Sequence, residues 1–309
     1  MKKFIVRLLY FLSPIFVGWM LIEAMYRFVP NNYTAKYEGL QTNKQAEVFI
    51  LGNSHSFYGL YPELMSKKVY NASNISQPLI CDKLIFEKYI LNNTNAKAIV
   101  LTVDNFSFNE GIDDAELSWR RYFYQDCMHV DIPETSIADP KLYSLALAPR
   151  FNITTESIKL YIDKGTLAQC NASGAGRNEG VNPEFNNETM AKKIVGKHAM
   201  ADGEMKPNIK ILEDLITAAA KKNIKVLIVT MPVTSYYAGF VDKNKIKKVS
   251  NICEQMEKYP NVTYLDLFTD SRFNNNDFYD TDHLNDTGAQ KCTAIVDGTL
   301  TKMLSIALP

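Results

Sequence analysis

Five short apolar runs, separated by longer segments, constrain the fold of this chain more than any other feature of its sequence. They lie at residues 47–51, 69–71, 97–103, 224–230 and 262–267. Short runs that are almost continuously apolar are typical of parallel strands buried on both faces. We expect helices between them at 82–91 and 208–222, and in the second of these the apolar residues recur at helical spacing. This alternation predicts an α/β fold, a doubly wound five-stranded parallel sheet with right-handed crossovers and helices on both faces.

The amino-terminal segment has the properties of a membrane helix. Residues 4–22 are mostly apolar, and Arg7 is their one charged residue. A helix of this length is roughly 28 Å long, close to the hydrocarbon thickness of a bilayer. Basic residues are more frequent at its start than at its end, so we expect a cytoplasmic amino terminus and an extracytoplasmic body. A cleaved signal peptide is the alternative, but residues 23–25 form a poor cleavage site, which favours an uncleaved single-pass anchor.

We divide the chain into an anchor at 1–28, a linker at 29–46 and an α/β domain at 47–309 that carries an insertion at 106–206. The third and fourth strands are about 120 residues apart, far more than a crossover helix needs. Residues 114–124 are expected to be helical, whereas 165–203 show no sustained period. The insertion is interpreted as a lid or acceptor-binding excursion over the sheet edge, and a surface insertion without function is the alternative.

The charge balance excludes the most common kind of nucleic-acid-binding protein. Lys and Arg total 34 and Asp and Glu total 34, so the formal net charge is zero, without the basic excess that phosphate binding requires. The five cysteines have no CxxC pair and no zinc-like Cys/His spacing. We expect buried thiols, although Cys127 and Cys170 could pair in an oxidising compartment. We therefore predict no cofactor, no metal and no nucleic-acid partner.

The first chemically informative motif is Gly52-Asn53-Ser54-His55-Ser56, directly after the first apolar run. A serine there lies at the carboxyl edge of the sheet, where backbone N–H groups at a helix start can stabilise negative charge. Serine needs a base within hydrogen-bond reach to become a nucleophile. The pattern is not GxSxG, because Ser56 occupies the last glycine position, so an α/β-hydrolase elbow is disfavoured. Taken alone, Ser54 fits a helix N-cap better than a catalyst.

The second motif, Asp280-Thr-Asp282-His283, follows the last strand and precedes the closing helix. An aspartate three residues before a histidine can turn back to its Nδ1–H, which leaves Nε2 free to face a serine. A solvated acidic loop is one alternative. A metal site formed by Asp280, Asp282 and His283 is another, but no second histidine has suitable spacing.

Together, the two motifs resemble those of the SGNH hydrolases, the GDSL-type esterase superfamily, over about residues 47–105 and 208–305. The resemblance implies a flavodoxin-like sheet, with Ser54 as nucleophile, His283 as base and Asp280 as its orienter. It also implies an oxyanion hole formed by the backbone of Ser54 and Ser76 and by Asn105. Asp104 precedes that asparagine, in the reverse of the family's order, and in its place would repel the oxyanion.

At residues 71–77 and 104–105 the chain departs from the family's conserved motifs. This departure, together with the single anchor, resembles the DltD-like and polysaccharide O-acylation branch of that superfamily. This resemblance implies an inner-membrane, single-pass esterase or acyltransferase that acts outside the cytoplasm on O-acyl groups of envelope polysaccharide. A multi-spanning membrane acyltransferase would be its partner. The alternative is a decayed SGNH-fold protein that binds glycan or such a partner.

Five further side chains, two of them next to Ser54 in the chain, are also of interest. Asn53, Trp119 and Arg120 are candidate substrate-binding residues, although aromatic residues at helical spacing more often belong to a core. His55 follows the candidate nucleophile directly, and we expect its side chain to point elsewhere. His198 has no evident partner in the sequence and is expected at the surface.

Overall fold

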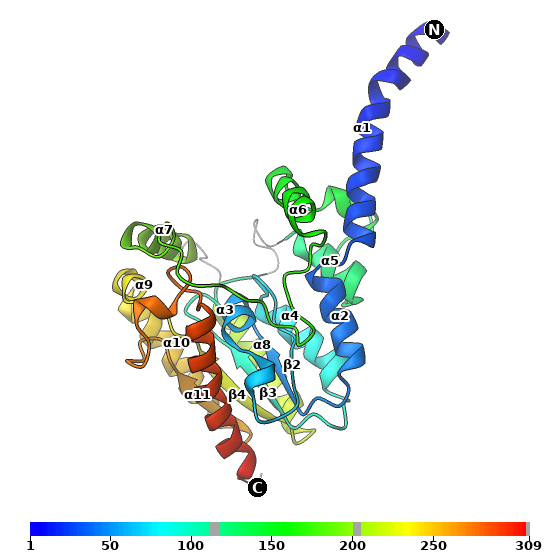
Figure 1. The fold of residues 1–309 in the computed structure, drawn as a ribbon. Coiled ribbons are helices and arrows are strands. Elements are labelled where there is room, and N and C mark those ends of the chain that lie inside the picture. Colours follow the sequence, from blue (N-terminus) through cyan, green and yellow to red (C-terminus); the bar gives the residue numbers. More distant parts are fainter. Residues whose placement is uncertain (112–117, 200–204, 307–309) are drawn as a thin grey trace. The chain divides into compact units, whose positions relative to one another are not determined.

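The computed structural model describes residues 1–111, 118–199 and 205–306. The chain divides into two units (Figure 1). One unit consists of Met1–Tyr37 and Ala115–Gln169, and the other of Glu38–Asp114 and Cys170–Pro309. The insertion expected at 106–206 is therefore shared between the units, and its middle part belongs with the amino-terminal helix.

The second unit is built on a five-stranded sheet whose pairs are all parallel. Its strands are β1 Val48–Leu51, β2 Val69–Asn71, β3 Ala98–Thr102, β4 Lys225–Thr230 and β5 Val262–Asp266. The spatial order is β2-β1-β3-β4-β5, the flavodoxin-like order. Each strand begins and ends within one residue of an apolar run, so the predicted sheet is confirmed.

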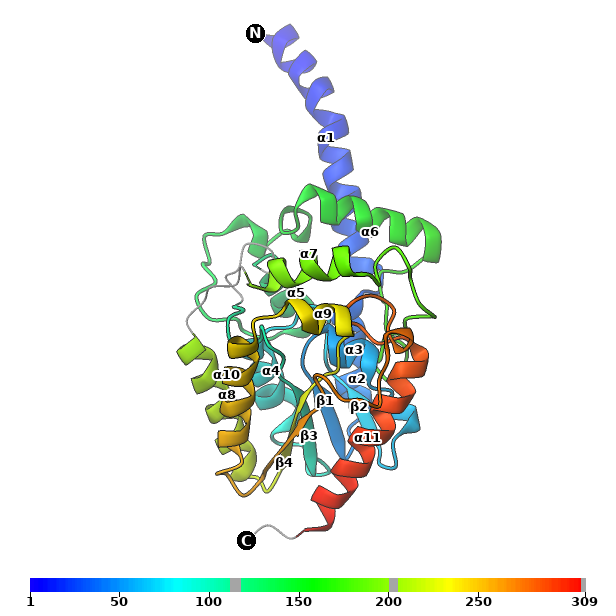
Figure 2. The ribbon, with the colours of Figure 1, turned by 90° about the vertical axis from the view of Figure 1, so that its left-hand side faces the viewer.

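Helices cover both faces of this sheet (Figure 2). The helices of the unit are α3 Ser54–Gly59, α4 Leu79–Ile85, α7 Glu188–Ala199, α8 Met205–Ala220, α9 Ser235–Phe240, α10 Lys243–Met256 and α11 Asp286–Ser305. A π-helical turn, η2 Phe86–Ile90, extends α4, and short 3₁₀ turns lie at η1 Pro62–Leu64 and η5 Asn275–Asp277. The predicted helices at 82–91 and 208–222 correspond to α4 with η2 and to α8.

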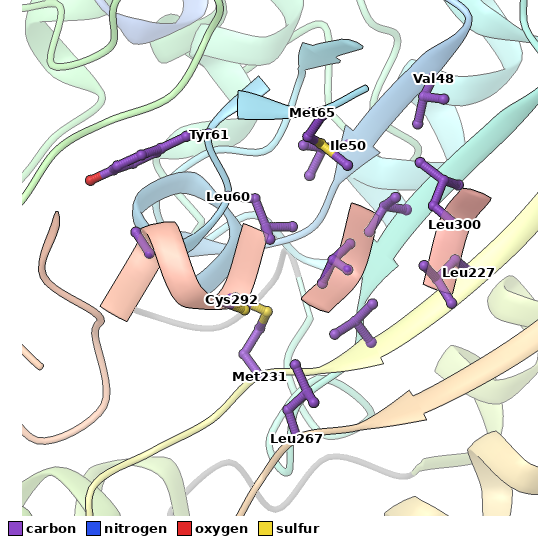
Figure 3. Packing of buried hydrophobic residues seen from close by; sticks show 14 of the residues in the cluster. Val48, Ile50, Leu60, Tyr61, Met65, Leu227, Met231, Leu267, Cys292 and Leu300 are labelled. Carbon is purple, nitrogen blue, oxygen red and sulfur yellow. The ribbon is translucent and has the colours of Figure 1, made fainter. Parts of the chain in front are cut away.

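One core lies between the sheet and α11 (Figure 3). Val48 and Ile50 of β1 and Leu227 of β4 point toward Cys292 and Leu300 of α11, and all five side chains are buried. Alternate residues of each strand point to the opposite face, where α4 and α8 pack together. Burial on both faces explains why the strands read as continuous apolar runs.

The first unit contains the amino-terminal helix α1, Lys2–Phe28, together with α5 Arg120–Met128 and α6 Phe151–Lys164. Two 3₁₀ turns, η3 Pro140–Leu142 and η4 Leu145–Leu147, connect the last two helices. Within the described chain, α1 is long and apolar enough to cross a membrane, and most of its apolar side chains are exposed. Its last turns join an aromatic core in which the rings of Tyr26 and Tyr33 lie 5.2 and 5.3 Å from that of Phe123.

Three expectations about the connecting segments differ from the structure. The linker at 29–46 is mostly helix α2, Asn32–Thr42, because the Asn31 side chain accepts from the N–H groups of its first turn. Helix α7 lies within 165–203, although that stretch is rich in polar residues. The helix expected at 114–124 is observed as α5, which begins at Arg120 and ends at Met128, four residues later than expected. Residues 114–117 lie outside the described residues. All five cysteines are free thiols.

Candidate active site

The turn after β1 presents Ser54 at the carboxyl edge of the sheet. Gly52 has a φ of +124°, and a Cβ there would lie 2.7 Å from Thr102 Cβ, so only glycine fits. Asn53 caps α3 by accepting from the backbone N–H of His55. Ser54 is the first residue of α3 and is half-buried, which leaves its hydroxyl within reach of a small molecule.

The loop at 278–284, between β5 and α11, holds the second motif. Phe278 bridges to Leu284, which closes the loop at its base. Asp280 Oδ1 accepts from the backbone N–H of Asp282 at 3.1 Å and from that of His283 at 2.8 Å. The same carboxylate lies 3.0 Å from His283 Nδ1 through Oδ2. The aspartate therefore turns back to the histidine within one tight loop.

Ser54, His283 and Asp280 are brought together in the structure. His283 Nε2 lies 2.8 Å from Ser54 Oγ. Because an ionised carboxylate can only accept, the hydrogen between His283 and Asp280 belongs on Nδ1, and Nε2 can then accept the serine proton. Burial alone would lower the pKa of His283, but the carboxylates of Asp280 and Asp282 outweigh it and raise that pKa above its ordinary 6.5. The side chains of His283 and Asp280 are 22% and 24% exposed, so a substrate can reach them.

Behind these three residues lies a fully buried ionic cluster centred on His55. Its Nδ1 lies 3.0 Å from Asp104 Oδ2, in an ion pair that is not a well-directed hydrogen bond. Its Nε2 lies 3.4 Å from Asp282 Oδ2. The three side chains are 1%, 3% and 4% exposed. Burial would lower the pKa of His55, but the two carboxylates raise it to about 10, so this imidazole is a cation at neutral pH.

The sequence reasoning missed this cluster. His55 does point away from the accessible side, as expected, but its partners come from the segment just after β3 and from the loop at 278–284. Asp282 lies between the two histidines, because its Oδ1 is 3.6 Å from His283 Nδ1 while its Oδ2 faces His55. The rings of His55 and His283 are 5.1 Å apart. The available signal was a histidine beside the serine and two aspartates after strand ends.

The order Asp104-Asn105 has a structural explanation. The Asp104 carboxylate accepts from Asn53 Nδ2 at 2.9 Å, in addition to its ion pair with His55. It is therefore held in the buried cluster. Asn105 is also buried, and its Oδ1 accepts from Tyr237 Oη at 3.3 Å. Asn53 is a predicted substrate-binding residue, but both polar atoms of its side-chain amide form hydrogen bonds within the protein, the nitrogen to Asp104 and the oxygen to the backbone of His55.

The loop that carries Ser76 is fastened to the turn that carries Ser54. Ser76 adopts a left-handed conformation with a φ of +52°. The buried Asp82 accepts from Gly52 N and from Gln77 Nε2, both at 2.7 Å, and so links the two loops. Burial raises the pKa of Asp82 to about 8, against these hydrogen bonds, which lower it.

Helix α7 contributes a histidine close to the buried cluster. His198 Nδ1 lies 2.7 Å from Tyr237 Oη, and its ring is 4.2 Å from that of Phe106. Phe106 in turn contacts the His55 ring edge-on at 5.6 Å. Burial lowers the pKa of His198 to about 4, so this imidazole is neutral. The expectation that His198 lies at the surface without a partner is wrong, because α7 packs on α9 and encloses it.

Trp119 and Arg120, the other predicted substrate-binding residues, belong to the first unit. The Arg120 guanidinium lies over the Trp119 ring at 4.6 Å and donates to Tyr33 Oη at 3.0 Å. Trp119 contacts Phe123 edge-on at 5.4 Å. These contacts extend the aromatic cluster of that unit, which was the alternative interpretation of this stretch.

One group of side chains among the described residues has ligand atoms close enough for a metal ion. Atoms of His55, Asp282 and His283 lie within 4.8 Å of one another. The structure thus supplies the second histidine that the sequence spacing did not. Each of these side chains already has an oppositely charged or hydrogen-bonding partner in the protein, so we assign no metal to the cluster.

No family model matches the chain, and no curated protein matches it. Three solved structures are similar in fold. A provisionally assigned acylhydrolase from Bacteroides fragilis is 10% identical, with a TM-score of 0.40 over 83% of this chain and 87% of that one. A GDSL-like lipase from Bacteroides thetaiotaomicron is 10% identical, with a TM-score of 0.41 over 87% and 98%. A provisionally assigned platelet activating factor from Streptococcus pneumonia is 12% identical, with a TM-score of 0.43 over 94% and 99%.

Similarities of this strength carry no functional information by themselves. The function therefore has to follow from the geometry of the site.

Proposed function

We propose that this chain is a membrane-anchored serine enzyme that hydrolyses or transfers acyl esters. The observation that carries the proposal is the 2.8 Å separation between Ser54 Oγ and His283 Nε2, on a histidine whose Nδ1 faces Asp280 at 3.0 Å. Serine becomes a nucleophile only beside such a base, and the base works best when a third group fixes its tautomer. These three residues have the geometry of an acyl-transfer triad.

The reaction proceeds in two halves. Ser54 Oγ attacks the carbonyl carbon of the ester while its proton passes to His283 Nε2. The tetrahedral intermediate collapses when His283 returns this proton to the departing alcohol, which leaves the acyl group on Ser54. His283 then takes a proton from water or an acceptor hydroxyl, whose oxygen attacks the acyl group. The second tetrahedral intermediate collapses as His283 gives this proton to Ser54 Oγ, which breaks the bond to the acyl group and restores the serine hydroxyl. Asp280 stabilises the imidazolium that forms in both halves.

Three donors are proposed for the developing oxyanion: the backbone N–H groups of Ser54 and Ser76 and the side-chain amide of Asn105. Asp82 supports this arrangement, because it fastens the loop of Ser76 to the turn of Ser54. Tyr237 supports it as well, since its hydroxyl donates to Asn105 Oδ1 and so directs the amide oxygen away from the oxyanion. Preorganised donors of this kind contribute most of the rate in many acyl-transfer enzymes.

The proposed substrate is an O-acylated carbohydrate of the cell envelope. A cavity of about 720 Å³ lies next to Phe278, where the loop at 278–284 begins. Its lining includes hydroxyl, amide and aromatic side chains, namely Ser235, Phe273, Asn274, Asn275 and Asn276. Hydroxyls and amides can hydrogen-bond to sugar hydroxyls, and aromatic rings pack against sugar faces. This composition supports a carbohydrate subsite at the start of the loop that carries Asp280 and His283.

The proposed location is the inner membrane, with α1 as a single-pass anchor and the body outside the cytoplasm. The length and composition of α1 support the anchor. The basic residues at its start support the orientation. A multi-spanning acyltransferase that delivers acyl groups across the membrane is the proposed partner.

The alternative is a non-catalytic glycan-binding protein with the same fold. Its main support in the sequence was Asp104, whose charge would oppose an oxyanion. The contacts of Asp104 with His55 and Asn53 remove this objection, because the carboxylate is paired inside the buried cluster. We therefore favour the enzyme.

A fluorophosphonate probe on the full-length protein, followed by intact mass, tests the proposal. We expect one adduct in the wild type and none in Ser54→Ala or His283→Ala. Ser56→Ala is the matched control, since Ser56 Oγ is buried against the carbonyl of Asn53, and it should label normally. Ser76→Ala should label too, because its proposed donor is the backbone. A folded wild type that does not label would favour the binding protein.

The products then distinguish hydrolysis from transfer. With p-nitrophenyl acetate as donor and a soluble oligosaccharide as acceptor, an acetylated oligosaccharide identifies a transferase. If free acetate is the only acetyl-containing product, the protein is an esterase. Ser54→Ala provides the background in both cases.

A further inference from the structure

Helix α6 of the first unit has an exposed apolar stripe. Phe151 and Ile162 are 85% and 75% exposed, and with Thr155 and Ile158 they are spaced to fall on one side of the helix. The opposite side carries Ile153 and Leu160, which are half-buried. Large apolar side chains that line up in the open need a partner to cover them.

The contacts of α1 set the level at which this region meets a membrane. Trp19 Nε1 donates to Ser144 Oγ at 3.0 Å, and Glu23 Oε2 accepts from Ser144 Oγ and from Ala146 N. The apolar part of α1 ends at Ile22. Residues 143–147, which contain η4, therefore contact α1 where its hydrocarbon-compatible part ends, beside a tryptophan, the residue type that gathers at membrane interfaces.

Helix α6 meets α1 one turn further on. Tyr26 Oη donates to Thr154 Oγ1 and Ser157 Oγ, at 3.4 and 3.2 Å. At 1.5 Å per residue, Tyr26 lies about 6 Å beyond Ile22, within the headgroup layer. The exposed side chains of Tyr143 and Leu147 lie in the segment just before α6.

The direction of α6 is that of a helix lying on a membrane. In Figure 1 it is seen nearly end-on beside an upright α1, and in Figure 2 it runs across α1. A helix that runs across a membrane-spanning helix lies parallel to the bilayer plane. An apolar stripe on such a helix is the signature of an interfacial helix.

We propose that α6 and residues 143–147 form a membrane foot, which binds the lipid headgroup layer with Phe151 and Ile162 inserted at the acyl boundary. This proposal requires that α1 crosses the bilayer, and it does not depend on the proposed acyl chemistry. It gives the first unit a second attachment to the membrane, so that this unit keeps one height and one tilt. A single helix anchor would leave both undefined.

Spin labels on the full-length protein in nanodiscs of phosphatidylcholine and phosphatidylglycerol test the foot. Single cysteines replace Phe151, Ile162 or Glu156 in a Cys170→Ser background, because Cys170 is the one native thiol that is not buried. Glu156 is the matched control, since it is exposed on another side of the same helix. Leu12→Cys, in the middle of α1, reports whether the anchor itself lies in lipid.

We expect labels at 151 and 162 to collide several-fold more with oxygen, which concentrates in lipid, than with a water-soluble nickel chelate. The label at 156 should show the opposite preference. Labels at 151 and 162 that behave like the one at 156 would overturn the foot. Protection from both reagents would overturn it too, in favour of a protein partner. A water-exposed label at position 12 would refute the anchor on which the foot depends.

Discussion

His55 and His283 lie side by side, with ring centroids 5.1 Å apart, yet their surroundings differ in every respect that matters for proton transfer. His283 is accessible and lies between a serine hydroxyl and a partly exposed carboxylate. His55 is enclosed between the two buried carboxylates of Asp104 and Asp282. The carboxylates of Asp280 and Asp282 raise the pKa of His283 against its burial, whereas His55 is held as a cation.

The difference also shows how the charges of the neighbouring aspartates are distributed between the two histidines. Asp280, Asp282 and Asp104 lie close to the two histidines, and the charges of Asp280 and Asp282 raise the pKa of His283. The fixed charge of His55 pairs with two of them, and it lowers the pKa of His283 while the carboxylates raise it.

The largest effect should come from the accessible histidine. His283→Gln removes the base, so we expect the rate of fluorophosphonate labelling to fall by about 10³-fold or more. The free energy of unfolding should stay near that of the wild type, because the side chain is partly exposed and Gln can still hydrogen-bond. Labelling rates and urea unfolding, measured on the same preparation, check both halves. Labelling at the wild-type rate would remove His283 from the proposed mechanism.

The buried histidine should show the reverse pattern. His55→Gln leaves the buried carboxylates of Asp104 and Asp282 without their cationic partner. Breaking a buried ion pair typically costs about 3–5 kcal/mol of unfolding free energy. Adding Asp104→Asn should recover part of this loss, because it removes one of the two unpaired charges. Urea unfolding of the single and double variants gives the comparison. Wild-type stability in His55→Gln would contradict the ion-pair assignment.

The same ion pairs predict how stability depends on pH. The pKa of His55 is about 10 in the folded protein and near its ordinary 6.5 in the unfolded chain. Its contribution is therefore complete below pH 6.5 and is lost as the pH rises through about 10, by about 1.4 kcal/mol per pH unit between them. The stability difference between wild type and His55→Gln should shrink accordingly. A difference that is constant over this range would mean that His55 is neutral when folded.

The sequence alone was sufficient to predict the strands and those parts of the site that are formed by residues close together in the chain. The five strands are short apolar runs because they are buried on both faces, so their positions could be read within one residue. The Asp280–His283 contact spans three residues inside one tight loop, and Ser54 follows a strand through a glycine turn. Periodicity and turn chemistry predict such features without knowledge of the remaining fold.

The buried cluster could not be predicted in this way. His55 is adjacent to Ser54 in the chain, but its two partners come from the end of β3 and from the loop at 278–284, and only the folded sheet brings them together. The helix α2 was missed because its stability comes from the Asn31 cap and from burial of Tyr33 and Leu40, neither of which is visible in its polar composition. Tertiary contacts decided both cases.

The smallest expected effect concerns the carboxylate that lies between the two histidines. Asp282→Asn removes a negative charge that raises the pKa of His283, so that pKa should fall. His283 is an active base when neutral, so the acid limb of the labelling rate should move to lower pH. Asp104→Asn is the matched control, because Asp104 pairs with His55 and should displace this limb less. Labelling rates across the acid limb measure both variants. If Asp282→Asn moves the limb upward or not at all, Asp282 does not act on His283, and the two histidines are electrostatically separate despite their proximity.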